Sequence, residues 1–142
     1  MRMKNSTFFI LILFAFIVGG SSCQSEAELN YIRYYTTGKQ LYESNCQNCH
    51  GNDGKGLAML YPPLTDSIYL KKNKNQLACI IKNGLKGRIE INGQVYEGEM
   101  PAQAKLSDIE IAKIITYITN SFGNQQGLHD AQAVNQDLKY CK

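Results

Sequence analysis

Two cysteines separated by two residues and followed directly by a histidine occur at Cys46, Cys49 and His50. This spacing is typical of a c-type heme attachment site. Two thiols one helical turn apart can each add to a vinyl group on one edge of the same heme, and the adjacent imidazole can then reach the iron. The motif therefore predicts one covalently attached heme c, with Cys46 and Cys49 as thioether donors and His50 as an iron ligand.

Two other kinds of site also use a Cys-x-x-Cys pair, and the sequence lacks the remaining features of both. A thioredoxin-like pair requires a preceding strand in a βαβ context, which the surrounding residues do not indicate. A structural zinc site requires a second close pair of ligands. The other cysteines, Cys23, Cys79 and Cys141, are scattered, and His129 has no companion ligand. Heme attachment is therefore the favoured interpretation.

Met100 is the candidate for a second iron ligand. It lies two residues after Gly98 and directly before Pro101, so its backbone is expected to be extended and its thioether free to project. The alternatives are His129, if the C-terminal tail folds back, or Met59, which is close to the heme motif in sequence. A heme enzyme or sensor with an open iron position remains a further alternative.

The N-terminus has the pattern of a secretory signal peptide, which we assign to residues 1–22. Basic residues precede an apolar run over residues 8–18, which is too short to span a membrane. The end of this segment resembles the lipobox of bacterial lipoproteins, with Cys23 as the lipidated residue, although Gly20 stands where a larger aliphatic residue is usual. The alternative is ordinary cleavage with Cys23 free or in a disulfide. We expect an exported, periplasmic-side protein, anchored to a membrane through lipid.

Cys79 and Cys141 are the remaining cysteines, and they could form a disulfide because exported proteins meet an oxidising environment. Alternatively, Cys79 is a small buried apolar residue, since it lies among Leu77, Ile80 and Ile81. The sequence does not show whether the two Cβ atoms approach each other, so both interpretations stay open.

Composition narrows the class of protein. A chain of 142 residues fits one domain, and its 44% apolar and 19% charged residues argue against a multi-span membrane protein. The net charge of +3 and the lack of a basic-aromatic patch give no indication of nucleic-acid binding.

Local signals predict how the first part of the chain is organised. Residues 23–36 are expected to form a tether after the anchor. Thr37 and Gln40 have the spacing of a capping box, which predicts a short helix from about Gly38 into the heme motif.

Later signals predict three more helices and one hairpin. Asp66 and Asn75 are candidate N-caps of short helices. Ser107 begins a second capping box before a stripe of apolar residues that extends to Phe122. Alternating apolar residues on both sides of the Asn-Gly pair at 92–93 predict a tight β-hairpin.

Together these motifs resemble class I cytochromes c, and the resemblance covers about residues 37–123. It implies an all-α cytochrome c fold, with short helices around one covalent heme and a small β-hairpin before the distal Met100. It also implies that His50 is the proximal ligand and that the carbonyl of Pro62 accepts its Nδ1–H. Residues 124–142 then form a C-terminal tail, which can carry one more short helix.

The resemblance also implies that Gly38 and Tyr42 lie where the N-terminal helix crosses the C-terminal helix, with Tyr117 as the matching aromatic residue. It implies single-electron transfer between redox proteins such as a dehydrogenase, a reductase or an oxidase, without catalysis or a small-molecule substrate. The hairpin resembles that of cytochrome subunits serving quinoprotein dehydrogenases or copper enzymes, so such a subunit is the alternative. A non-heme interaction lipoprotein is a further alternative. Five basic residues are candidates to rim the heme edge and steer an acidic partner: Lys71, Lys72, Lys74, Lys82 and Lys86.

Overall fold

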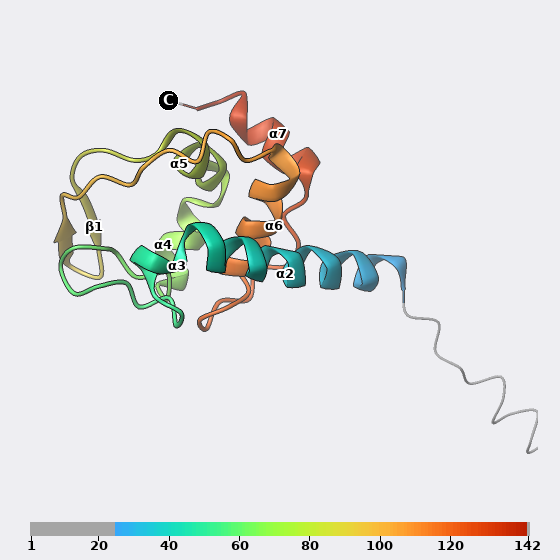
Figure 1. Ribbon diagram of the computed structural model, residues 1–142, viewed down its shortest axis with the longest axis horizontal. Coiled ribbons are helices and arrows are strands. Elements are labelled where there is room, and N and C mark those ends of the chain that lie inside the picture. The colour runs from blue at the N-terminus through green and yellow to red at the C-terminus, as the bar shows by residue number, and fades with distance from the viewer. Residues whose placement is uncertain (1–24, 142) are drawn as a thin grey trace, which may run out of the picture.

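The computed structural model describes residues 25–141, which form short helices and one two-stranded hairpin (Figure 1). The assigned signal peptide and Cys23 lie outside the described residues. The predicted fold class, all-α with a small hairpin, is confirmed. Within residues 25–141, no helix combines the length and the apolar character needed to cross a bilayer. In chain order the elements are α2 (Glu26–Asn45), α3 (Gln47–His50), α4 (Ser67–Lys72), the 3₁₀ turn η1 (Lys74–Gln76), α5 (Leu77–Asn83), β1 (Ile89–Ile91), β2 (Gln94–Tyr96), α6 (Asp108–Ile118) and α7 (Ala131–Leu138).

Helix α2 begins earlier than the sequence predicts. The hydroxyl of Ser25 caps it by accepting a hydrogen bond from the Glu28 N–H at 3.2 Å. Helix α2 therefore occupies the described part of the segment expected as a tether, and Thr37 lies inside the helix rather than at its cap. The physical reason is that Ser25 supplies an earlier cap, while Tyr35 packs against the buried core and so favours continued helix.

Helices α2 and α6 cross at Gly38 (Figure 1). A Cβ atom on Gly38 would collide with the backbone carbonyl of Lys113 in α6. One turn further along α2, the Tyr42 ring is buried and its centroid lies 5.3 Å from that of Tyr117. The close approach of the two backbones requires glycine, whose low helix propensity is the cost of this contact.

Helices α4 and α5 form one wall of the domain. Asp66 caps α4 as predicted, because its Oδ1 accepts the N–H groups of Ile68 and Tyr69, both at 2.9 Å. Asn75 does not cap α5, and this prediction was wrong, since Asn75 lies inside the 3₁₀ turn that precedes the helix. Helix α5 ends before Gly84, whose φ of 78° favours glycine.

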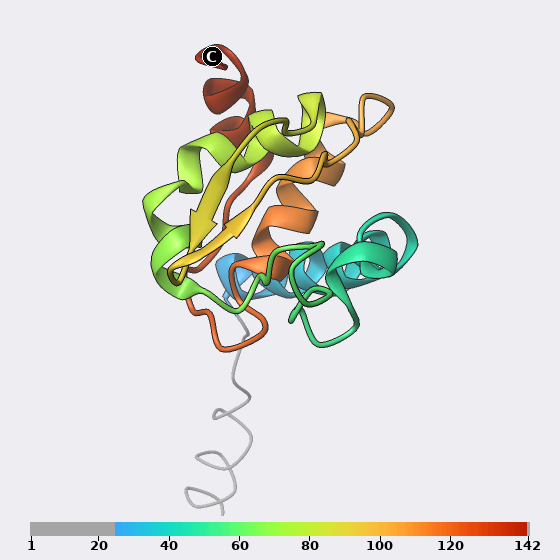
Figure 2. The same cartoon turned by 90° about the vertical axis from the view of Figure 1, so that its left-hand side faces the viewer.

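Strands β1 and β2 form the predicted antiparallel hairpin (Figure 2). Ile89 pairs with Tyr96 across the ladder. Asn92 and Gly93 have φ angles of 52° and 74°. Positive φ at both central positions is what a tight type I′ turn requires. The Asn-Gly pair therefore sets the register that buries Tyr96 and Ile91 on the inner side.

Helix α6 starts with the predicted capping box, in which the Ser107 N–H donates to Glu110 Oε2 at 2.8 Å. The helix ends at Ile118, one turn earlier than expected, because the Asn124 side-chain amide donates to the Ile118 carbonyl at 3.0 Å. Phe122, which the sequence places on the helical stripe, has a φ of 58° outside the helix. It still packs on the core.

Helix α7 makes the C-terminal residues part of the domain. Val134 is fully buried, and α7 contacts both α5 and α6. A disulfide joins Cys79 of α5 to Cys141, with a Cα–Cα distance of 5.4 Å. The helix that the tail was expected to allow is therefore present and packed.

Candidate heme-binding site

An apolar cavity lies between α4, α5, α6, the hairpin and the heme motif. It contains about 650 Å³ of space not filled by protein atoms, including its open mouth. A second cavity of about 500 Å³, measured in the same way, adjoins it. Both cavities are lined by His50, Pro62, Leu85, Ile89 and Met100. Because they share these lining residues, the two cavities lie side by side and form the two parts of the candidate site.

His50 lies at the end of α3 and lines both parts of the cavity. Its Nδ1 is 3.0 Å from the carbonyl oxygen of Pro62. A carbonyl can only accept, so Nδ1 carries the proton and Nε2 has a free lone pair. Burial lowers the pKa of His50, and the hydrogen bond to Pro62 opposes this shift. The ring is thus a neutral, oriented imidazole, which is the form that binds iron.

The segment that carries Pro62 is held in place by two hydrogen bonds of Leu64. Leu64, two residues later, donates its N–H to the Gly54 carbonyl at 2.7 Å. The Leu64 carbonyl accepts a hydrogen bond from the Asn124 side chain at 2.9 Å. The sequence did not single out Asn124. Its only local signal is an asparagine shortly after a helix end, and its partner is sixty residues away in the chain.

The hydroxyl of Tyr42 fixes the turn that follows the heme motif. It donates to the Gly51 carbonyl at 2.6 Å, directly after His50. Burial raises the pKa of Tyr42 well above its usual range, so the hydroxyl keeps its proton at any physiological pH. Since Tyr42 also lines the larger part of the cavity, it connects the α2–α6 crossing to the proximal residue.

Cys46 and Cys49 both carry free, half-buried thiols. Cys46 lines the larger part of the cavity and Cys49 the smaller part, and His50 lines both. Burial, with a smaller effect of Cys49, raises the pKa of the Cys46 thiol to about 11. The helical turn of α3 thus brings the two thiols and the imidazole together, as the spacing predicts.

Met100 lies on the wall formed by the segment after β2. Its N–H donates to the Leu85 carbonyl at 2.9 Å, and the Leu85 N–H donates to the Met100 carbonyl at 3.0 Å. A Cβ atom on Gly84 would collide with the Met100 carbonyl oxygen. From the sequence, Gly84 was predicted only to end a helix, and Leu85 was not predicted to have a role. The pairing of Leu85 with Met100 joins residues that are distant in the chain, so it leaves no local sequence pattern.

The two alternative ligands lie outside this space. His129 is buried elsewhere, with its Nε2 3.0 Å from Asp137 Oδ2, and burial lowers its pKa against the attraction of that carboxylate. Met59 has 69% of its surface exposed. Neither residue is among those that line the two parts of the cavity. The structure therefore brings Cys46, Cys49 and His50 together with Met100, and not with His129 or Met59.

Three of the five lysines proposed to rim the heme edge have polar partners in the structure. Lys74 and Lys82 donate to backbone carbonyls in the C-terminal part of the chain, at 3.1 and 2.6 Å. Lys86 pairs with Glu99 at 2.9 Å, beside the smaller part of the cavity. Lys86 thus has an acidic neighbour beside the cavity.

Comparisons with known proteins agree with this arrangement. The family model described as "Cytochrome C oxidase, cbb3-type, subunit III" matches residues 34–118. The chain is similar to "Cytochrome c-552" of Thermus thermophilus, with 30% identity over 116 residues, which cover 79% of this chain and 72% of the relative.

Two further relatives are much longer than this chain, which matches only one part of each. The chain is 33% identical over 92 residues to "Cbb3-type cytochrome c oxidase subunit CcoP" of Rhodobacter capsulatus, covering 63% of this chain and 30% of the relative. It is 36% identical over 109 residues to "Fructose dehydrogenase cytochrome subunit" of Gluconobacter japonicus, covering 71% of this chain and 22% of the relative. The chain thus spans less than a third of either relative.

The range matched by the family model contains the whole heme motif, Pro62 and Met100. The same residues form the apolar walls, the paired thiols and the neutral imidazole that a covalently bound porphyrin requires. The chain therefore belongs to the cytochrome c family, and its cofactor is covalently attached heme c.

Proposed function

We propose that this protein is a mono-heme cytochrome that carries single electrons between redox partner proteins. In this proposal Cys46 and Cys49 would form the thioether bonds, and His50 and Met100 would bind the iron. One observation carries the proposal: His50 and Met100, from distant parts of the chain, both line each of the two adjoining apolar cavities. When bound, the heme supplies reversible one-electron chemistry at its iron.

The proposed ligands favour a carrier over an enzyme. A histidine nitrogen and a methionine sulfur would occupy both axial positions, which leaves no coordination position for a substrate. A thioether is a soft ligand that favours ferrous iron, so Met100 is expected to raise the reduction potential relative to a second histidine. The hydrogen bond from His50 to Pro62 limits rotation of the proximal ring and so supports a stable ligand geometry.

Substitution of Met100 tests the ligand assignment. The Met100→Ala holoprotein should lose the thioether-to-iron charge-transfer band of the ferric spectrum and should have a lower reduction potential. Met59→Ala is the matched control, because this exposed methionine lies outside the cavity, and it should leave both properties unchanged. A band that survives in Met100→Ala would refute the assignment, and His129→Ala would then show whether His129 is the ligand.

Carbon monoxide distinguishes the carrier from a sensor or enzyme with an open site. The reduced wild-type protein should bind the gas slowly or incompletely, because Met100 must first leave the iron. Met100→Ala should bind it rapidly and stoichiometrically. Rapid stoichiometric binding by the wild type would favour the open-site alternative.

We further propose that the protein is exported and attached to a membrane on the periplasmic side through lipid on Cys23. The signal pattern of residues 1–22 supports export, and a disulfide between Cys79 and Cys141 is compatible with an oxidising compartment. Intact mass and a pyridine hemochrome assay on protein matured in an exporting host should give one heme that resists acidified acetone, plus a lipid. Cys23→Ser should lose the lipid and partition into the aqueous phase while keeping its heme.

The proposed partners are redox proteins, either an oxidase or a dehydrogenase. This rests on relatives named as subunits of a cbb3-type oxidase and of fructose and quinone-dependent alcohol dehydrogenases. A mobile carrier should be purified alone and should restore electron flow when it is added back to depleted membranes. An electron-accepting subunit of a quinoprotein dehydrogenase or copper oxidoreductase is the alternative, and it should instead remain bound to its enzyme at high salt.

A further inference from the structure

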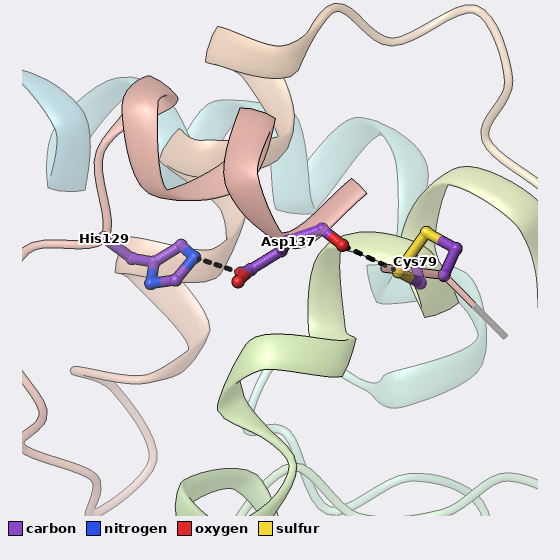
Figure 3. Close-up of a disulfide and its surroundings, with 4 residues drawn as sticks. Cys79, His129 and Asp137 are labelled. Carbon is purple, nitrogen blue, oxygen red and sulfur yellow. Dashed lines mark hydrogen bonds and ion pairs between the residues drawn. A yellow bond between two sulfur atoms is a disulfide. The ribbon is translucent and has the colours of Figure 1, made fainter. Parts of the chain in front are cut away.

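The disulfide between Cys79 and Cys141 attaches the C-terminal segment to α5 (Figure 3). Cys79 lies in the middle of α5, and its Sγ is 3.6 Å from the Asp137 carbonyl oxygen of α7. This is a packing contact rather than a hydrogen bond, because a disulfide sulfur carries no proton. The disulfide bond and this packing contact together fix the end of α7 against α5.

The same C-terminal segment is attached to α6 through His129. The buried Thr116 hydroxyl of α6 accepts the His129 N–H and donates to the His129 carbonyl, both at 3.1 Å. The His129 ring pairs with Asp137 of α7, as the dashed line in Figure 3 shows. The segment from His129 to Cys141 therefore bridges α5 and α6.

Helix α5 in turn carries the backbone of the Met100 segment. The Ile81 carbonyl, two residues after Cys79, accepts the Gln103 N–H at 2.9 Å. Leu85, just beyond the helix, makes the reciprocal pair of hydrogen bonds with Met100. A displacement of α5 would therefore displace the Met100 backbone as well.

The cavity walls depend on the same two helices. Ile81 from α5 lines the larger part of the cavity together with Ile114 and Ile118 from α6. All three side chains are buried. The spacing of α5 and α6 therefore sets both the width of this part and the position of the segment that contains Met100.

We propose that the Cys79–Cys141 disulfide is a positioning element for the distal ligand: by fixing α5 to the C-terminal segment, it keeps Met100 in place over the iron. The inference rests on the proposed function, in which Met100 is that ligand. Cys79 and Cys141 do not touch the cavity and act through α5. Without the covalent bond, α5 and the Met100 segment open more often while the rest of the domain stays folded.

The test uses imidazole, which binds the ferric iron only when Met100 has left it. Cys79→Ser combined with Cys141→Ser should raise the apparent affinity for imidazole on the order of tenfold. This factor is expected if about half of the free energy by which a disulfide usually stabilises a protein acts on the position of Met100. The charge-transfer band should also be lost at a lower urea concentration than the helical signal, whereas in the wild type the two are lost together.

Ser25→Ala is the matched control. It removes the cap of α2, at the far side of the molecule from α5, and it should lower overall stability without changing the affinity for imidazole. An unchanged imidazole affinity in the double serine variant would overturn the inference. A wild-type protein without the charge-transfer band would instead overturn the assignment of Met100, so the two failures are distinguishable.

Amide hydrogen exchange of the wild-type holoprotein provides a second measurement if the double variant does not mature. The Met100 and Gln103 amides should exchange with the same opening free energy as the amides of α5 and α7. Exchange of Met100 together with β1 and β2, independently of α5, would overturn the inference.

Discussion

At the scale of single residues, His129 combines burial with a charged neighbour. Its side chain is 6% exposed, and its Nε2 lies 3.0 Å from Asp137 Oδ2. Burial disfavours the charged imidazolium and lowers the pKa of His129, with Lys74 acting in the same direction, while Asp137 and Asp130 oppose the shift. The folded protein therefore favours a neutral ring that donates to the carboxylate.

This shift predicts a pH dependence of stability. The imidazole pKa in the unfolded chain, about 6.5, exceeds that in the folded protein, so the unfolded chain binds more protons below about pH 6.5. The free energy of unfolding should therefore fall on acidification, by up to about 1.4 kcal/mol per pH unit. His129→Gln, whose amide can still donate to Asp137, should make this slope shallower by the contribution of His129. Urea unfolding of both ferric holoproteins between about pH 5 and pH 8 measures it, and identical slopes would contradict the prediction.

The sequence identified the residues whose chemistry depends on close spacing. Cys46, Cys49 and His50 follow from one motif, and Met100 follows from its place before a proline. Leu85 and Asn124, which fix the backbone around these residues, were not predicted. Their partners lie far away in the chain, and an ordinary leucine or asparagine has no type or spacing that reveals such a contact.

At the scale of elements, the crossing of α2 and α6 sets the most demanding packing requirement. Gly38→Ala should destabilise the holoprotein by about 1–3 kcal/mol, because the new methyl group would overlap the Lys113 carbonyl and push the two helices apart. Thr36→Ala is the control, since Thr36 is exposed on the same helix. Thermal unfolding followed by circular dichroism measures both, and equal midpoints for the two variants would show that the crossing tolerates a side chain.

Element boundaries were predictable where a side chain alone satisfies the helix end. Asp66 and Ser107 do this with hydrogen bonds inside their own first turns, and the turn at 92–93 requires only two residues with positive φ. The sequence misplaced the starts of α2 and α5 and the end of α6. Those boundaries depend on the competing cap at Ser25 and on a 3₁₀ turn before α5. The end of α6 also depends on Asn124, whose side-chain amide donates to the carbonyls of both Leu64 and Ile118.

At the scale of the whole molecule, the heme takes the place of a missing part of the core. Most of the buried apolar residues form one cluster around α2, α5, α6 and α7. Several residues of this cluster also line the apolar space, so the space is continuous with the core. Isoleucines of α5 and α6 line this space, so a bound porphyrin would add apolar contacts to the core. Folding and cofactor binding are therefore linked.

Removal of the heme should accordingly weaken the entire domain. Cys46→Ala combined with Cys49→Ala, purified free of heme, should be less stable than the holoprotein by several kcal/mol, on the order of the cost of large core cavities. Its urea transition should also be broad. The holoprotein under identical conditions is the reference, and an equally cooperative transition at the same urea concentration would refute this view of the core.

The long separation of the two disulfide partners has a consequence for biogenesis. Cys79 and Cys141 are 62 residues apart, and both lie downstream of the heme motif. If the chain crosses a membrane with its N-terminus first, Cys46 and Cys49 emerge well before Cys141. The maturation machinery can then consume the first two thiols before the last one is available for oxidation. Under that order, Cys46 and Cys49 would be in thioether linkage before Cys141 could pair with either of them.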